Sequence, residues 1–279
     1  MDLLYPILAV ISESVGKTAD KFNYTRNKIR PRELLFLLFS TIIIGLLASL
    51  VFIPQSFPIL SLGTVGIIAF MIAISFGQNF FDYVGLHTKN LSLREPISNL
   101  EPILASFLAY LLFPSERNVK YIVAIFTGVI ILYLGSADRK LKLTFDKGII
   151  YLLLGTVCSA ILASVYKFGL ETIAPLYLLL FRIIGVLVLT QLFFRPNLRS
   201  LKKPQIGLGV VSGLIYIAGN LTRLYSIQHL GLNITILILL LGPVVVYIAS
   251  AVVIKEKVQP KQIVASAALL ALIVWATYL

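Results

Sequence analysis

The chain has 279 residues, of which 58% are hydrophobic and only 13% are charged. A soluble domain carries about twice that charged fraction, and a disordered chain lacks this abundance of Leu, Ile and Val. The net charge of +12 comes from Lys and Arg residues scattered over many short loops, which form no continuous basic face for a nucleic acid. The composition therefore predicts a protein embedded in a lipid bilayer, without a nucleic-acid partner.

Apolar runs of about 20 residues, the length at which an α-helix crosses a bilayer, follow one another along the chain. Proline residues flank most of these runs, where a residue without a backbone N–H is best tolerated. Only Pro102 and Pro243 lie clearly inside a run, away from its ends. We expect an all-α integral membrane protein with ten transmembrane helices, over residues 3–22, 33–53, 60–86, 96–113, 119–136, 148–168, 175–194, 206–228, 233–254 and 261–278.

Lys and Arg residues are divided unevenly between the two alternating sets of loops. One set holds most of them, whereas the other holds only Arg117, Lys120, Lys167 and Arg223, and Arg182 lies within a helix. Because loops rich in positive charge stay in the cytoplasm, this count places both termini outside. We expect a multi-pass protein of a prokaryotic plasma membrane.

The sequence repeats itself at a shift of 141 residues. Residues 77–80, Gly-Gln-Asn-Phe, align with residues 218–221, Ala-Gly-Asn-Leu, and Pro102 aligns with Pro243. Each half then holds five helices, and an odd number means that the second copy enters the membrane from the opposite side. Inverted repeats are typical of alternating-access transporters, although channels also contain them.

Each half has a fourth helix that carries a proline and ends at an acidic residue, followed by a helix rich in Gly or Ala. These features are Pro102, Glu116 and residues 128–135 in the first half, and Pro243, Glu256 and residues 265–271 in the second. In them each half resembles an EamA-type repeat of the drug/metabolite transporter superfamily. The resemblance implies two five-helix repeats, residues 1–140 and 141–279, and a transporter that exports amino-acid-like or related solutes.

Other residues agree or disagree with this family pattern. Arg182 is similar to the family's arginine in the second helix of a repeat, but the first half has Phe39-Ser40 at the corresponding place. The first helix also lacks the usual tryptophan. Members of the family more often have cytoplasmic termini, which is opposite to the orientation that the charge count predicts.

Glu13 lies about ten residues, or about 15 Å, into the first predicted helix and so near the bilayer midplane. A charge at this depth costs about 2.5 to 3.5 kcal/mol, so it usually faces a cavity or a partner. We interpret Glu13 as a substrate-binding carboxylate that takes a proton or a cationic group of the solute. The alternative is a carboxylate satisfied by neighbouring hydroxyl or backbone groups.

The third and eighth predicted helices carry matching polar stripes. In each, three residues at spacings of four and three share one face: Ser75, Asn79 and Asp82, and their repeat equivalents Tyr216, Asn220 and Arg223. We expect the serine, the tyrosine and both asparagines to line a central substrate site with Glu13. Asp82 and Arg223 are expected near opposite gates, without direct contact. The alternative is that these two charges reach lipid headgroups from helix ends.

Glu101 lies beside Pro102, one turn into the fourth predicted helix, where missing hydrogen bonds open a helix towards a cavity. We interpret it as a gating or cavity residue, or as the ion-pair partner of Arg94 or another base on the cytoplasmic side. Arg182 is interpreted as a structural ion pair or an interfacial residue rather than as a substrate contact.

No motif for phosphate, nucleophilic or metal chemistry occurs in the chain: it has no Walker-type loop, no GxSxG, no HExxH and no cluster of Cys or His. The sequence therefore predicts neither an enzyme nor a cofactor or metal. We expect a secondary transporter of small organic metabolites that works by alternating access, with a proton as the candidate coupling ion. The alternatives are a passive facilitator or channel and a non-transporting scaffold or sensor, and the sequence is compatible with a monomer or a homodimer.

Overall fold

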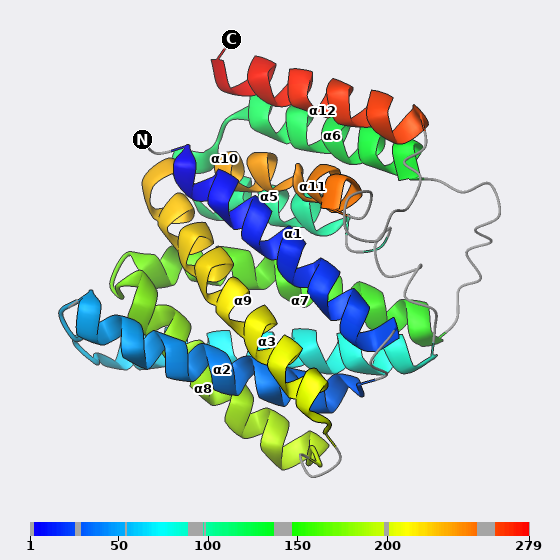
Figure 1. Ribbon diagram of the computed structural model, residues 1–279. Helices are drawn as coiled ribbons and strands as arrows, with labels where there is room; N and C mark the ends of the chain where they lie inside the picture. Colours follow the sequence, from blue (N-terminus) through cyan, green and yellow to red (C-terminus); the bar gives the residue numbers. More distant parts are fainter. Residues whose placement is uncertain are drawn as a thin grey trace.

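A computed structural model describes residues 3–25, 29–53, 55–88, 97, 99–136, 147–197, 201–249 and 260–278. All regular elements in these ranges are helical (Figure 1). They are α1 (Leu4–Thr25), α2 (Pro31–Phe52), α3 (Leu62–Thr88), α5 (Glu101–Leu112), the 3₁₀ turn η2 (Pro114–Glu116), α6 (Val119–Ser136), α7 (Lys147–Leu170), α8 (Pro175–Phe194), α9 (Lys203–Leu230), α10 (Leu232–Leu239), α11 (Gly242–Ala249) and α12 (Pro260–Tyr278). The prediction of an all-α protein is confirmed.

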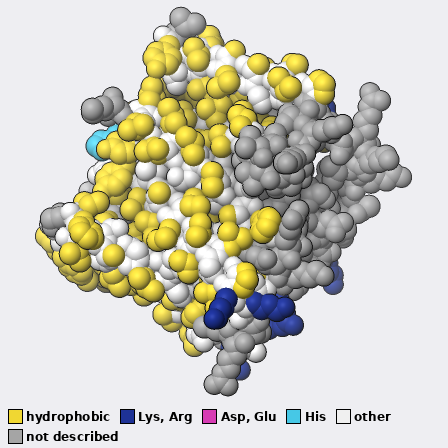
Figure 2. Space-filling model, viewed as in Figure 1, with side chains coloured by type: hydrophobic (Ala, Val, Ile, Leu, Met, Phe, Trp, Pro, Cys, Tyr) yellow, Lys and Arg dark blue, Asp and Glu magenta, His cyan; other side chains and the backbone are white. Residues whose placement is uncertain are grey.

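Six of the described helices, α2, α3, α7, α8, α9 and α12, are long and apolar enough to cross a membrane. Shorter apolar helices occupy residues 101–112, 119–135 and 232–248. Large apolar side chains project from the surface, where Leu62 is 91% and Ile59 87% exposed, and they cover much of the face seen in Figure 2. Such a surface is stable in lipid and unfavourable in water. The protein is an integral, multi-pass membrane protein.

Prolines mark the beginnings of many helices. Pro31, Pro175 and Pro260 are the first residues of α2, α8 and α12. At this position the ring fits the helical φ, and the missing N–H has no partner to lose. Pro102 and Pro243 follow the same rule, because each is the second residue of its helix. The expectation that these two prolines lie inside helices is therefore wrong.

The predicted helices 96–113 and 233–254 are accordingly not continuous. α5 begins at Glu101, so Glu101 is the first residue of its helix rather than one turn inside it. Residues 232–249 form α10 and α11, with a break at Leu240 and Leu241. A proline ring clashes with the carbonyl group four residues earlier, which prevents a helix from running straight through. Residues 250–254, the predicted end of the second of these helices, lie outside the described residues.

The helices of the two halves of the chain pack in a mirrored pattern. α1 packs against α9 as α7 packs against α3, and α2 packs against α9 as α8 packs against α3. α1 also packs against α11 as α7 packs against α5. The pairs α2 with α8 and α6 with α12 complete the pattern, and the second of these pairs lies at the top of Figure 1. Exchanging the two halves leaves this set of neighbours unchanged.

The buried core centres on α7 and α8. Their side chains Leu152, Leu178 and Ile183 are at most 1% exposed, and α7 is packed against α3, α5 and α8. In a membrane, where lipid is as apolar as leucine, such packing depends on close van der Waals contact. Both ends of the chain lie on the same side of the molecule, at the upper left of Figure 1.

Candidate functional site

A group of three charged side chains, here called the triad, joins α1, α5 and α9. Arg223 of α9 forms an ion pair with Glu13 of α1, with 3.6 Å between Nη1 and Oε1. It forms a second with Glu101 of α5, with 3.4 Å between Nη2 and Oε1. The side chains of Arg223, Glu13 and Glu101 are 21%, 17% and 25% exposed. The triad therefore adjoins a space that water-sized molecules can enter.

The triad lies beside both helix breaks. Glu101 is the first residue of α5. Ser14, the neighbour of Glu13, donates a hydrogen bond of 3.1 Å to the backbone oxygen of Gly242, the first residue of α11. The first turn of a helix has backbone N–H groups without intrahelical partners and a partial positive charge. In transporters, broken helices of this kind build the sites for substrates and coupling ions.

A polar seam continues along α1 and α9, which run antiparallel. The Tyr216 hydroxyl donates a hydrogen bond of 2.8 Å to Oδ2 of Asp20. Gly219 faces Glu13: a Cβ on Gly219 would lie 3.1 Å from Cγ of Glu13, which is tighter than an ordinary contact, so an alanine there would have to displace α1 or its side chains by a few tenths of an ångström. Sequence reasoning missed Asp20, although it lies seven residues after Glu13 and therefore on the same helical face.

Arg182 of α8 is close enough to the triad to interact electrostatically with Arg223 and Glu13. Its guanidinium donates a hydrogen bond to the Tyr166 hydroxyl of α7 and lies 5.4 Å from the centre of the same ring. Its Nε is buried and has no hydrogen-bond partner among the described residues. From the sequence, Arg182 is expected to form a structural ion pair or to lie at the interface; among the described residues it forms no ion pair.

The polar stripe of α3 lies apart from the triad. Ser75 is buried, and the Asn79 amide donates a hydrogen bond of 2.7 Å to the Ser75 backbone oxygen. The Asn220 amide makes the equivalent bond of 2.8 Å to the Tyr216 backbone oxygen in α9. α3 packs mainly against α7 and α8. The structure thus joins Glu13, Glu101 and Arg223 and sets Tyr216 against α1, whereas the Asn220 amide bonds within α9 and Ser75 and Asn79 lie on α3.

Asp82 lies against α7. The Asp82 carboxylate packs directly against Gly155 of α7: a Cβ on Gly155 would lie only 2.5 Å from Oδ1 of Asp82, so a larger residue would displace this carboxylate. Arg223 has its ion pairs with Glu13 and Glu101 instead. Among the described residues, Arg223 is the base that forms an ion pair with Glu101; Arg94 lies outside these residues.

Glu116, the acidic residue at the end of the fourth predicted helix, is buried and caps α10. Its carboxylate oxygens accept hydrogen bonds of 2.7 Å and 3.0 Å from the backbone N–H groups of Leu232 and Asn233, and it forms an ion pair with Lys167 of α7. An anion at a helix N-terminus satisfies unpaired N–H groups and the helix dipole. This contact holds η2, α7 and α10 together. The repeat equivalent, Glu256, lies outside the described residues.

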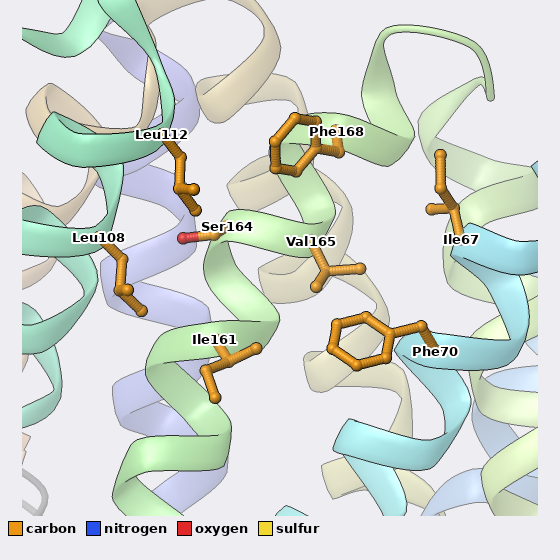
Figure 3. Close-up of a pocket in the computed structure, with 8 residues that line it drawn as sticks. All are labelled: Ile67, Phe70, Leu108, Leu112, Ile161, Ser164, Val165 and Phe168. Atoms are coloured by element: carbon orange, nitrogen blue, oxygen red, sulfur yellow. The ribbon is translucent and has the colours of Figure 1, made fainter. Parts of the chain in front are cut away.

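An apolar pocket of about 240 Å³ lies between α3, α5 and α7, away from the triad (Figure 3). Phe70 and Leu112 at its rim are 51% and 47% exposed, so the pocket opens towards the lipid. Its lining is Ile67, Phe70, Leu108, Leu112, Ile161, Ser164, Val165 and Phe168. Without a charged lining residue it is suited to lipid or other apolar groups rather than to a charged solute. Among the described residues, no group of three His, Cys, Asp or Glu is placed to hold a metal ion.

The helices and the charged group define a multi-pass membrane protein with a polar centre. Residues 146–278 match the EamA-like transporter family, a member of the drug/metabolite transporter superfamily, which confirms the resemblance for the second half of the chain and indicates a membrane transporter. No curated protein matches the sequence. A solved structure titled only "Crystal structure of protein" aligns with a TM-score of 0.79, over 99% of this chain and 96% of the other, at 15% identity. That likeness shows a shared fold over nearly the whole chain.

Proposed function

We propose that the protein is a secondary transporter that moves small organic solutes across the membrane by alternating access. The family match over residues 146–278 supports the class of protein. One observation carries the mechanism: the ion pairs of Arg223 with Glu13 and Glu101 lie beside the two helix breaks. The architecture that we propose consists of two inverted five-helix repeats, residues 1–140 and 141–279.

The mirrored helix packing supports the inverted repeat. The contacts of α1 with α9 and α11 have counterparts in the contacts of α7 with α3 and α5. The breaks before Pro102 and Pro243 are at matching positions. Two halves related in this way form two alternative packings of similar energy, one open to each side of the membrane, which is the basis of alternating access.

The triad can link solute binding to movement. Two carboxylates and one guanidinium give it a net charge of −1, which attracts a proton or a cationic group. When Glu13 binds such a group, its attraction to Arg223 weakens and the connection between α9 and α1 is released, and the same event at Glu101 releases the connection between α9 and α5. We assign Glu13 to proton or cation binding and Glu101 and Arg223 to gating. We propose that Tyr216 and Asn220 line the transport path from α9 and that Ser75 and Asn79 line it from α3, away from the triad, with Asp82 at a second gate.

A flux screen with the purified protein in liposomes tests this function. Separate pools of amino acids, nucleosides and organic cations are offered with and without a pH gradient, with protonophore-treated and protein-free liposomes as controls. We expect saturable flux for at least one pool, faster with the gradient and slowed by the protonophore. Saturable flux that is unaffected by the pH gradient and by the protonophore would indicate a passive facilitator instead of a coupled transporter. If no pool gave solute flux, the result would contradict transport and favour a scaffold or sensor.

A further inference from the structure

We propose that a basic patch at one end of the helix bundle binds the phosphate headgroups of anionic membrane lipids. The patch joins three segments of the chain, at the start of α2, at the end of α8 and at the start of α9. Its members are Arg30, Arg32, Arg195, Lys202 and Lys203. This inference goes beyond the proposed transport function and does not depend on it.

The packing of α2 against α9 brings two of these segments together. Leu201, which precedes α9, packs against the apolar cluster that contains Ile29, which precedes α2. Further along, a Cβ on Gly213 of α9 would lie 2.7 Å from Cβ of Thr41 of α2, and each of the two residues lies ten positions after the first residue of its helix. The two helices therefore run in the same direction, with their starts side by side.

Glu33 connects the end of α8 to the start of α2. Its side chain is 1% exposed, and Oε1 accepts hydrogen bonds of 2.8 Å from Nε of Arg32 and of 3.4 Å from the backbone N–H of Asn197, two residues after Arg195. Among the described residues, the other four members of the patch form no ion pair. Five cations and one buried carboxylate leave the patch with a net charge of +4. Glu33 is a positioning residue that holds the segments together.

Among the described residues, no exposed acid lies beside the patch. Arg32 is 29% exposed, and the other four members are more exposed still. Within the described ranges, Glu171 is the one exposed acidic residue, and it precedes α8, whose other end carries Arg195. A helix of 20 residues, such as α8, is about 30 Å long. Glu171 is thus too far away to neutralise the patch, which is left to an anion from outside the protein.

The patch lies at the depth of the lipid headgroups. Leu192 and Phe193 in the last turn of α8 are 63% and 64% exposed, and Ile206 in the first turn of α9 is 39% exposed. Such side chains face the acyl chains of the bilayer. Arg195 and Lys203 lie within a turn of them, towards the end of the bundle. Figure 2 shows Lys and Arg side chains gathered at the lower edge of the apolar face.

The chemistry of the patch matches lipid phosphate. Arginine binds phosphate through the planar fork of its guanidinium, and lysine binds it as a point charge. All five members belong to the set of loops that holds most of the positive charge, which the charge count places in the cytoplasm. Clusters of about four to eight Lys or Arg residues on the cytoplasmic side of transmembrane helices bind anionic headgroups. The joined segments hold such a headgroup at one place between α2, α8 and α9.

Lipid binding to the purified, full-length protein tests the patch without a transport measurement. Native mass spectrometry gives the apparent affinities for phosphatidylglycerol, cardiolipin and phosphatidylcholine, and thermal unfolding in nanodiscs of these lipids gives their effect on stability. Inorganic phosphate is the soluble probe. The patch variant is Arg30→Gln, Lys202→Gln, with one change in each of two segments. The matched control, Arg117→Gln, Lys120→Gln, also removes one arginine and one lysine but lies outside the patch.

We expect the wild-type protein to bind both anionic lipids about tenfold or more tightly than phosphatidylcholine. The patch variant should lose most of this preference, and the control should keep it. Added salt should weaken the preference in the wild type, because ions screen exposed charges. This last measurement requires no variant.

Equal affinity of the wild type for anionic lipids and phosphatidylcholine would overturn the proposal, as would a preference that salt leaves unchanged. An unchanged preference in the patch variant would also overturn it. An equal loss in the patch variant and the control would assign the effect to net charge rather than to the patch. If inorganic phosphate bound as tightly as the anionic lipids, the patch would be a site for a soluble anion and the lipid proposal would be rejected.

Discussion

Arg223 of α9 and Glu101 of α5 form an ion pair, with 3.4 Å between Nη2 and Oε1, although α9 packs chiefly against α1 and α2. The same guanidinium binds Glu13 through Nη1. One arginine therefore connects three helices that are far apart in the sequence, at the place where α5 begins. This connection is the part of the molecule on which the proposed mechanism depends.

Replacing Arg223 by Gln should destabilise the protein and stop transport. The change leaves Glu13 and Glu101 without their shared cation, so two carboxylates that lie close together repel each other. Loss of one partner of a fully buried ion pair lowers the free energy of unfolding by about 3 to 5 kcal/mol. Because these side chains keep up to 25% of their surface exposed, we expect a smaller loss of about 2 kcal/mol. Thermal unfolding in lipid nanodiscs measures the change. The double variant Arg223→Gln, Glu101→Gln should recover part of the stability, and a single variant as stable as the wild type would refute the role of the pair.

Gly231 should not tolerate alanine. Its φ is +86°, and a Cβ there would lie 2.6 Å from Oε1 of Glu116, which caps α10. Backbone strain at such a φ costs about 1 to 3 kcal/mol, and displacement of Glu116 adds to it. The matched control is Gly66→Ala in α3, where nothing lies within 4 Å and a better helix former should be neutral or slightly stabilising. Denaturant or heat unfolding of both variants checks the difference, and equal stabilities would disprove the constraint.

Glu116→Gln should lower stability without removing transport. The neutral amide loses the ion pair with Lys167 and weakens the bonds to the α10 N-terminus. We expect a loss of about 1 to 3 kcal/mol, because the side chain is only 6% exposed. Flux per folded molecule should stay near the wild-type rate, which separates Glu116 from the triad. A large loss of flux in a stable, folded variant would place Glu116 in the transport path after all.

Tyr216→Phe removes the hydrogen bond from the hydroxyl to Asp20 and leaves the ring in place. The free energy of unfolding should fall by about 1.5 to 3 kcal/mol, the contribution of one hydrogen bond to a charged group. Because Tyr216 lies on the α1–α9 seam, we also expect the apparent affinity for the solute to fall. The comparison is Tyr278→Phe, whose side chain is 71% exposed at the end of α12. Identical behaviour of the two variants would exclude Tyr216 from the site.

Helix positions could be predicted well from the sequence because they depend on local features. Apolar runs of spanning length and prolines at helix starts placed α2, α6, α8 and α12 within about two residues of their observed ends. The breaks before Pro102 and Pro243 were missed because the apolar run continues across them, and an apolar run does not by itself distinguish one helix from two short ones. The prolines were the available signal.

The candidate site was harder to predict, because its contacts join residues that lie far apart in the sequence. Glu13 was identified from its depth alone, but its partner Arg223 is 210 positions away, and the sequence placed Arg223 near a gate. Asp20 was predictable from its spacing to Glu13. Arg182 was interpreted as a structural ion pair or an interfacial residue, and the packing of α8 against α7 and α9 is what brings it near the triad.

The initial rate of solute flux in Glu13→Gln proteoliposomes tests the central claim most directly. The variant keeps the size of the side chain and removes the charge that binds Arg223 and, in our account, the coupling proton or cationic group. The control is Glu171→Gln, which neutralises an exposed glutamate between α7 and α8. We predict that wild type and control show saturable flux that follows an imposed pH gradient, and that Glu13→Gln loses at least nine-tenths of it, about 1.4 kcal/mol or more in activation free energy. Gradient-driven flux at the wild-type rate in Glu13→Gln would contradict the account.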